Sequence, residues 1–435
     1  MVTRIKAVFF QCILVGGYLL AQGCEATKPN GKMVDSYQLP PNILNLSGVP
    51  NEPTDRSIST FCDLGAWHAY AIPDDPKYYG GFIGPFAMTR DNGIWLGKKF
   101  AHISLEHKNG QGIKFSEKAQ FDQYPGWLEQ KLISEDGDIS LTLRLWFISN
   151  RSVAVTATIL NNSKAKLELT PTWKGDIWLP DAGFNIDQGL SLTYSTTTHQ
   201  YRFLDKVKID VDSDGKAYSA RNMGSFKIQP GGSAQTGIIY SVLFEGESNL
   251  TTHNTSLAEL NQSFTETKTR WNKYHQAFPY TQNHWLDSSN FMMLRSKAIQ
   301  TLINNWKSAA GELKHDGLFP SYHYQGFHGF WAWDSWKHAV ALSRFHPDLA
   351  KQQVQAMFDF QNQRGMIADC IFRDTLIENH NWRDTKPPLA AWAVSEIFGQ
   401  TEDTAFVKEM FPKLINYHQW WYNDRDHDKN GLCEY

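Results

Sequence analysis

The spacing of the apolar residues changes near residue 250, and this change constrains the fold more than any other feature of the chain. Before it, residues 139–146, 153–159 and 166–172 alternate between apolar and polar side chains, which is typical of strands with one buried face. After it, apolar residues recur at helical spacing. The two predicted helix faces are Ala350, Val354, Met357 and Phe358, and Phe406, Met410, Leu414, Tyr417 and Trp421. Because 435 residues exceed one ordinary core, we expect a β-rich domain followed by an α-helical one.

The domain limits follow from this change of pattern. Short strands separated by Gly, Asn, Asp and Pro clusters favour an antiparallel β-sandwich, which we place at residues 27–250. Residues 251–284 are predicted to be a linker, with a charged and polar helix over 257–275. Residues 285–435 are predicted to form antiparallel helices joined by aromatic and acidic loops. This arrangement suggests the (α/α)6 six-hairpin toroid of many sugar hydrolases.

A complete toroid needs more chain than the helical part supplies. Twelve helices of about 11 residues with connections of about five need roughly 190 residues. Residues 285–435 number only 151, so we expect an incomplete toroid and a truncated chain. Within this part, Pro387 and Pro388 predict a helix start, and Pro412 predicts a kink or a division of the last helix.

The N-terminus has the pattern of an export signal, which we place at residues 1–26. Basic residues precede an apolar run over residues 7–21, which is shorter than the roughly 20 residues that cross a bilayer. Gly23 followed by Cys24 resembles a bacterial lipoprotein cleavage site, whereas the alternative is ordinary cleavage nearby, for example after Ala26. We therefore expect a periplasmic protein or an outer-membrane lipoprotein, with membrane contact only through a lipid on Cys24.

Composition narrows the class of partner. The 42 basic and 45 acidic residues are spread without long runs, which argues against nucleic acid and anionic membranes as partners. Aromatic residues make up 14% of the chain, including 16 tryptophans, which favours a small carbohydrate ligand. Beyond the signal, the three cysteines Cys62, Cys370 and Cys433 indicate neither a disulfide framework nor a zinc site.

A cluster of tryptophans marks the candidate sugar pocket. Trp331, Trp333 and Trp336 surround Asp334 within six residues. Indole faces suit the C–H faces of a pyranose, and a carboxylate beside them accepts hydrogen bonds from hydroxyl groups. From spacing alone Asp334 would be the candidate catalytic acid, because flanking tryptophans exclude water and raise the pKa of a carboxyl group. The alternative is that Asp334 is a helix N-cap.

Other polar residues in the helical half complete the set of candidates. Glycoside hydrolysis usually needs two carboxylates. Besides Asp334, the available acids are Asp374, Glu378, Asp384 and Glu396, together with those of the terminal loop. The polar loop at residues 379–388 is of the kind that lines active sites, although a solvated loop has the same composition.

The terminal loop has the composition of a calcium site. Oxygen ligands at alternate positions are what Ca2+ prefers, and Gly431 permits a sharp turn. The candidate ligands are Asp426, Asp428, Asn430, the backbone carbonyl of Leu432, and Glu434. The glutamate comes too early for an EF-hand, and a polar turn without metal is the alternative.

Taken in order, several motifs resemble one enzyme family. The matching stretches are 63–68, 80–82, 333–337, 381–382, 385–387, 389–392 and 417–421, followed by the acidic loop. This ordered set resembles the bacterial periplasmic members of glycoside hydrolase family 63, which also contains the eukaryotic processing α-glucosidase I. The resemblance spans nearly the whole chain after the signal.

The resemblance implies a β-sandwich joined by a helical linker to an (α/α)6 toroid that cleaves α-glucosidic bonds with inversion. It assigns to Asp334 the binding of sugar hydroxyls and not proton donation, which replaces the expectation from spacing. It also implies that Trp331, Trp333 and Lys386 line the same pocket, and that the acidic loop binds Ca2+.

The family's catalytic acid and base have no counterpart here, because both would lie beyond Tyr435. We therefore assign no catalytic residue. The expected function is that of an exported inverting α-glucosidase acting on glucosyl di- or oligosaccharides, with little activity expected for these 435 residues alone. The alternatives are a trehalase, a glucosylglycerate or mannosylglycerate hydrolase, and a sugar-binding remnant without catalysis.

Overall fold

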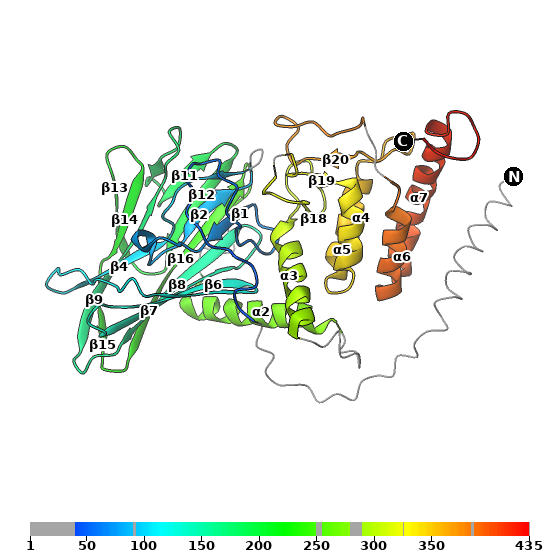
Figure 1. Ribbon diagram of the computed structural model, residues 1–435. Coiled ribbons are helices and arrows are strands. Elements are labelled where there is room, and N and C mark those ends of the chain that lie inside the picture. Colours follow the sequence, from blue (N-terminus) through cyan, green and yellow to red (C-terminus); the bar gives the residue numbers. More distant parts are fainter. Residues whose placement is uncertain are drawn as a thin grey trace. The chain divides into compact units, whose positions relative to one another are not determined.

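Antiparallel strands build the N-terminal part of the computed structural model (Figure 1). The structure describes residues 40–89, 93–248, 255–278, 289–324, 326–383 and 387–434. The strands of this part are β1 (His68–Ala71), β2 (Ile83–Ala87), β3 (Ile94–Trp95), β4 (His102–His107), β5 (Gln120–Tyr124), β6 (Trp127–Ile133), β7 (Ile139–Phe147), β8 (Ser152–Asn161), β9 (Leu167–Asp176), β10 (Phe184–Asn185), β11 (Ser191–Tyr194), β12 (Thr197–Phe203), β13 (Val207–Val211), β14 (Ala217–Asn222), β15 (Phe226–Ile228) and β16 (Ser233–Phe244).

Two of the sheets pack face to face. The larger has eight strands in the order β10-β11-β12-β16-β8-β7-β6-β5, and the other has the order β13-β14-β9-β15 with β4 also paired to β9. Tyr218 of β14 meets Tyr201 of β12 with ring centroids 5.3 Å apart. Trp173 of β9 donates from its indole nitrogen to the hydroxyl of Thr236 in β16 at 3.4 Å. The predicted β-rich part is confirmed, and the three alternating segments correspond to β7, β8 and β9.

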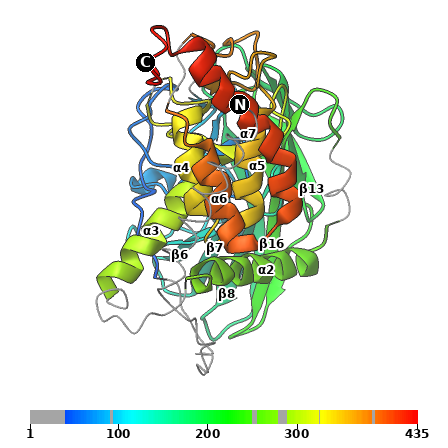
Figure 2. The same cartoon turned by 90° about the vertical axis from the view of Figure 1, so that its right-hand side faces the viewer.

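The second part is mainly helical. Its helices are α2 (Leu257–Gln276), α3 (Ser289–Asn305), α4 (Ala332–Leu342), α5 (Pro347–Phe358), α6 (Ala390–Thr401) and α7 (Thr404–Asp424). Four short strands lie among them, β17 (Trp306–Lys307), β18 (Gly317–Leu318), β19 (Phe330–Trp331) and β20 (Cys370–Ile371), and the sandwich carries one 3-10 turn, η1 (Pro76–Tyr78). Figure 2 shows α4 to α7 side by side, with α2 crossing below them. None of the helices in the described part of the chain combines the length and apolar character needed to span a bilayer.

The linker helix α2 has a well-defined start. The hydroxyl of Ser256 accepts from the backbone N–H of Glu259, and the carboxylate of Glu259 accepts from the N–H of Ser256. This reciprocal capping box satisfies two N–H groups that would otherwise lack partners. The helix also packs on the sandwich, because Trp146 of β7 donates to the hydroxyl of Ser263 at 3.0 Å.

The helix predictions hold with one correction. The face of α5 formed by Ala350, Val354, Met357 and Phe358 is buried, as the spacing predicted. Helix α6 begins at Ala390, just after the two prolines. Pro412 does not divide its segment, because α7 continues through it from Thr404 to Asp424. The predicted domain limits at 26, 250 and 284 fall outside the described residues and stay predictions.

A short segment of the sandwich, residues 60–67, contacts the helical part, and we call this contact the seam. Thr60 exchanges two hydrogen bonds with the hydroxyl of Tyr322, at 3.1 Å from its N–H and 2.9 Å to its carbonyl. Gly65 accepts from the N–H of Ser308 at 2.7 Å. A Cβ at Gly65 would lie only 2.8 Å from that nitrogen, and φ is +71°, so this close approach needs glycine.

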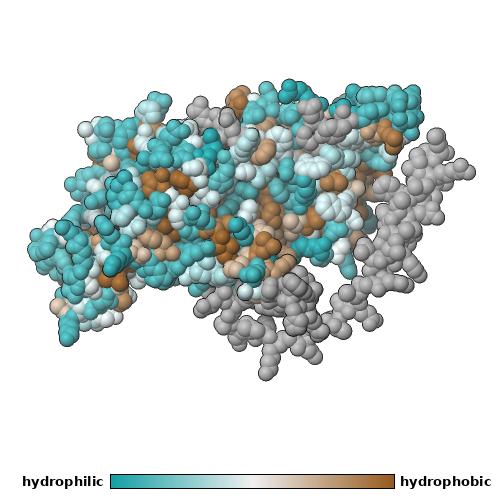
Figure 3. Space-filling view, viewed as in Figure 1, coloured by the Kyte–Doolittle hydropathy of each residue, from teal (hydrophilic) through white to brown (hydrophobic). Residues whose placement is uncertain are grey.

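The surface is mixed in character. On the face drawn in Figure 3, apolar residues occur as small groups among hydrophilic ones. Cys62 and Cys370 are buried and Cys433 is exposed, and all three are free thiols. Among the described residues there is therefore no disulfide.

Candidate functional site

The turn from β19 into α4 presents the tryptophan cluster. Strand β19 pairs antiparallel with β20, so that Phe330 lies opposite Ile371 and Trp331 opposite Cys370. The chain then enters α4, where the N–H of Ala332 donates to the carbonyl of Asp369 at 2.8 Å. Trp331 is the N-cap residue and makes no side-chain cap bond. Asp334 is inside the first turn, so the alternative that it is the N-cap is wrong.

Only part of the cluster is available to a ligand. Trp336 is fully buried and packs against Phe358 with ring centroids 5.8 Å apart, so it belongs to the core. Trp331, Trp333 and Asp334 are partly exposed. The ammonium of Lys337 lies 3.9 Å from the ring centroid of Trp333, a cation–π contact that fixes one indole face.

A second predicted element comes to the same place. The N–H of Asn381 donates to the carbonyl of Cys370 at 2.9 Å, and the carbonyl of Asn381 accepts from Asp369 at 2.8 Å. Strand β20 therefore lies between β19 and the loop that carries Asn381 and Trp382. Lys386 and Asp384, also predicted as candidates, lie outside the described residues.

Carboxylates gather around the thiol of Cys370. Burial raises the pKa of this thiol well above its ordinary value, and the negative charges of Asp369, Glu378 and Asp334 raise it further. Each of the three acids therefore lies close enough to Cys370 to act on it electrostatically. Asp369, which is buried and receives the amide of Asn381 at 3.4 Å, was missed by sequence reasoning. The only feature of the sequence that could have pointed to Asp369 is its position directly before Cys370 and Ile371, which form the buried strand β20.

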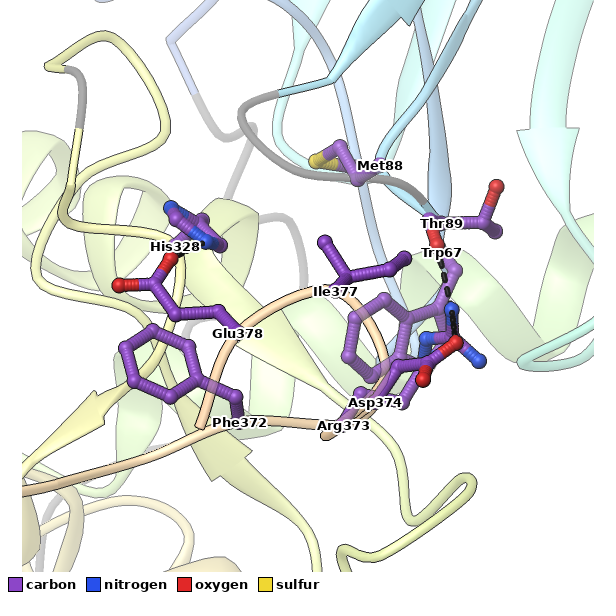
Figure 4. Close-up of a pocket in the computed structure, with 9 residues that line it drawn as sticks. All are labelled: Trp67, Met88, Thr89, His328, Phe372, Arg373, Asp374, Ile377 and Glu378. Atoms are coloured by element: carbon purple, nitrogen blue, oxygen red, sulfur yellow. Dashed lines mark hydrogen bonds and ion pairs between the residues drawn. The ribbon is translucent and has the colours of Figure 1, made fainter. Parts of the chain in front are cut away.

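A small pocket opens behind this site, between the sandwich and the helical part (Figure 4). Its enclosed space is about 20 Å³, roughly room for one water molecule. Its lining comes from both parts of the chain, namely Trp67, Met88, Thr89, His328, Phe372, Arg373, Asp374, Ile377 and Glu378.

The two acids of this pocket are each paired. Glu378 lies 2.9 Å from Nε2 of His328, and Asp374 lies 3.3 Å from Arg373. Arg373 also donates to the carbonyl of Thr89, which ties the loop to the sandwich. Burial lowers the pKa of Arg373, and the charge of Asp374 opposes this. The pocket therefore joins the two parts of the chain. Figure 4 shows the Glu378–His328 pair and the Asp374–Arg373 pair at opposite ends of the pocket, with Ile377 between them, so the two carboxylates do not face each other.

The remaining acid candidate of the helical half lies elsewhere. Glu396 of α6 forms an ion pair with Arg344 at 2.9 Å, and both side chains are exposed by a third or more. This ion pair involves no residue of the tryptophan turn. Sequence reasoning therefore grouped acids that the fold separates.

The acidic loop after α7 gathers its carboxylates as predicted. Ligand atoms of Asp426, Asp428 and Glu434 lie within 4.8 Å of one another. Backbone N–H groups of Gly431 and His427 donate to one oxygen of Asp426 and of Glu434, at 3.0 and 2.8 Å. The other oxygen of Asp426 is buried and has no hydrogen-bond partner within the described structure. An orphaned oxygen among clustered carboxylates fits a hard divalent cation.

Asn430 is engaged within the loop. Its amide nitrogen donates to Asp428 at 2.7 Å, and its carbonyl oxygen accepts from the N–H of Leu432 at 2.8 Å. These bonds hold the loop in its turn. A cation would therefore be bound mainly by the carboxylates, and it would share the Asn430 carbonyl oxygen with the N–H of Leu432.

Comparison with known proteins finds similarity to glycoside hydrolase families in both parts of the chain. Residues 327–435 match the family described as mannosylglycerate hydrolase MGH1-like glycoside hydrolase domain. Residues 50–221 match the family described as glucosidase YgjK, N-terminal. The β-rich and helical parts are thus both similar to parts of glycoside hydrolases.

Individual relatives agree with this class. A mannosylglycerate hydrolase of Thermus thermophilus is 28% identical over 156 residues, which are 31% of this chain and 35% of the relative. Mannosylglycerate hydrolase MGH1 of Selaginella moellendorffii is 27% identical over 134 residues, 27% of this chain and 26% of the relative. The chain thus spans about a third or less of the length of these relatives. A solved bacterial glucoamylase complexed with acarbose aligns with 89% of this chain and 70% of its own, at 10% identity and a TM-score of 0.45.

Proposed function

We propose that the protein is a glycoside hydrolase of the family 63 type, which cleaves α-glucosidic bonds of di- or oligosaccharides with inversion. The observation that carries the proposal is the joining of two predicted motifs across β20. Trp331 lies opposite Cys370 on one side, and Asn381 bonds to Cys370 on the other. The match of residues 50–221 to a glucosidase N-terminal family supports the glucosyl specificity.

In this proposal the tryptophan turn binds the sugar. The indoles of Trp331 and Trp333 stack on the C–H face of the pyranose, and the carboxylate of Asp334 accepts bonds from its hydroxyls. The family resemblance would add Lys386, which lies outside the described residues, to the sugar-binding residues. Hydrolysis also needs an acid and a base, which we assign to no residue of this chain. The helices α3 to α7 belong, on this proposal, to an (α/α)6 toroid.

A second candidate is a hydrolase of mannosylglycerate or glucosylglycerate. Similarity to the mannosylglycerate hydrolase family over residues 327–435 favours it. Lys337, held against Trp333, offers a cation to a glycerate carboxylate at the edge of the pocket. A trehalase would use the same pocket for a second glucose.

Two further proposals concern the surroundings of the site. The protein would be exported, as a periplasmic or lipid-anchored form, because of the pattern over residues 1–26. The acidic loop would hold a structural Ca2+ through Asp426, Asp428 and Glu434, with Asn430 and the Leu432 carbonyl completing the shell. The cation would neutralise the clustered charges and order the end of α7.

A substrate panel tests the proposed function. The protein expressed from its complete gene would be incubated with α-linked glucosyl disaccharides, trehalose, mannosylglycerate and glucosylglycerate. We expect glucose release from the α-glucosyl disaccharides, with the β-anomer formed first by NMR. Faster cleavage of the glycerate glycosides would establish the second candidate instead. Sugar binding without turnover would support the remaining alternative, a sugar-binding remnant without catalysis.

A further inference from the structure

Two exposed aromatic side chains continue outward from Trp331. Tyr324 is 65% exposed and Phe327 is 38% exposed. Ring centroids of Tyr324 and Phe327 are 5.0 Å apart, and those of Phe327 and Trp331 are 5.6 Å apart. The three rings form a continuous surface, which we call the aromatic row. It begins in the proposed sugar pocket and ends at the protein surface.

The aromatic row is held at both ends by buried anchors. Tyr322 is buried, and its hydroxyl bonds to both the N–H and the carbonyl of Thr60. Phe330 is fully buried in β19 and lies opposite Ile371. Buried residues thus flank Tyr324 and Phe327 on both sides along the chain.

The chemistry of the aromatic row selects a neutral ligand. Residues 321–331 contain no Lys, Arg, Asp or Glu. An anionic group laid along this segment would lose hydration without gaining a fixed positive charge from the segment itself. Apolar ring faces instead suit the C–H faces of successive sugar rings. The indole N–H of Trp331 is buried and has no hydrogen-bond partner within the described residues.

We propose that the aromatic row binds the sugar units that follow the one held by Trp331, Trp333 and Asp334. The preferred ligand is then a neutral oligosaccharide of at least three units, and not a glycosylglycerate. This inference rests on the proposed function, because it extends the same sugar pocket. Trp331 belongs to both, Phe327 meets the next unit, and Tyr324 meets the outermost one.

Chain-length dependence tests the row. The protein from the complete gene, with Phe327→Ala and Tyr324→Ala variants, would be assayed on two series, maltose to maltotetraose and isomaltose to isomaltotetraose. Affinity would be measured by quenching of tryptophan fluorescence, and turnover by glucose release. We expect affinity to rise with length in the series that binds. Tyr324→Ala should lose about 2- to 12-fold on sugars of three or more units, as one lost aromatic contact predicts, and little on the disaccharide. Phe327→Ala should lose a similar factor on every length, because the second unit of a disaccharide already contacts Phe327.

The controls separate this inference from the proposed function. Met223→Ala removes an apolar side chain of the sandwich that is 74% exposed and should change nothing, and Phe327→Tyr should keep the length effect. Length-dependent binding without turnover would support the row and refute the hydrolase. Disaccharide turnover with no gain from length, or equal losses on all lengths in Tyr324→Ala, would refute the row. Absence of binding in both series, or preference for mannosylglycerate, would also refute it.

Discussion

Arg270 of the linker helix forms a two-pronged ion pair with Asp63 of the sandwich. The guanidinium nitrogens lie 3.0 and 2.6 Å from the two carboxylate oxygens, and Asp63 is completely buried. The indole of Trp271 donates to the same carboxylate at 2.9 Å, and the N–H of Leu64 at 2.7 Å. Burial by itself would lower the pKa of Arg270, but the charge of Asp63 outweighs burial and raises that pKa above its ordinary value. Among the described residues, the buried charge of Asp63 in the seam is thus paired with a cation of the linker helix.

Removing either partner of this pair should destabilise the protein strongly. We expect Asp63→Asn or Arg270→Met to lower the free energy of unfolding by about 3 to 5 kcal/mol, because each leaves an uncompensated buried group. The double variant should lose less than the sum of the two. Urea denaturation measures all three. Arg344→Met, which breaks the exposed pair with Glu396, is the matched control and should cost under about 1 kcal/mol. A similar loss in the control would contradict this account.

Replacing Asp334 should weaken sugar binding without unfolding the site. Because a hydrogen bond to a charged group contributes about 1.5–3 kcal/mol, Asp334→Asn should reduce affinity for the bound sugar about 10- to 140-fold. Titration calorimetry with the best sugar of the panel measures this change, and the melting temperature checks the fold. Glu396→Gln, an acid outside the pocket, should keep full affinity. Unchanged affinity in Asp334→Asn would remove this residue from the proposed pocket.

Calcium should stabilise the protein through the acidic loop. At a free Ca2+ concentration 100 times the dissociation constant, the free energy of unfolding should rise by about 2.7 kcal/mol. Thermal melts with added CaCl2 and with chelator measure the shift. Asp426→Asn should abolish the difference, since Asp426 supplies the orphaned oxygen. Asp348→Asn removes an acid that is 82% exposed on α5 and should leave the calcium effect intact. A chelator effect that survives in Asp426→Asn would place the ion elsewhere.

Two histidines in the sandwich core should make stability fall in acid. Burial lowers the pKa of His68 and of His199 to about 3, from 6.5 in the unfolded chain. Nδ1 of His68 bonds to the hydroxyl of Tyr70 at 2.8 Å, and Nε2 of His199 bonds to Thr197 at 3.0 Å. Between pH 6.5 and 3 the unfolded chain therefore binds more protons than the folded one.

The sign of the pH dependence follows directly. The stability contributed by these histidines is complete above pH 6.5 and is lost as the pH falls towards 3, by up to about 1.4 kcal/mol per pH unit for each. Urea denaturation at pH 7.5, 6 and 5 measures the slope. His199→Gln should reduce it, whereas His107→Gln, at a partly exposed position, should not. A flat profile in the unmodified protein would show that the core histidines do not carry the effect.

The elements of the fold were predictable where a periodic pattern exists. Alternation over residues 139–146 predicted β7, because each apolar residue there points into one sheet face. Helical spacing predicted the buried face of α5 for the same reason. The prediction at Pro412 was wrong because the packing of the rest of α7 compensates for the backbone hydrogen bond that proline cannot donate.

The candidate site was predictable only in part. The tryptophan turn and the acidic loop were visible because their residues are close in sequence. The pairing of β19 with β20 joins residues about 40 positions apart, and no local pattern reports it. For the same reason Asp369 near the site and Arg270 at the seam went unnoticed, since each takes its role from a partner far along the chain.

The distance along the chain between Asp63 and Arg270 has a consequence for biosynthesis. The two residues are 207 positions apart, and Asp63 is made first. At about 5–20 residues per second, the ribosome needs roughly 10 to 40 s to deliver the arginine after the aspartate. During that interval the nascent sandwich carries a carboxylate that it cannot yet enclose. Final closure of the sandwich around residues 60–67 must therefore wait until the linker helix leaves the exit tunnel.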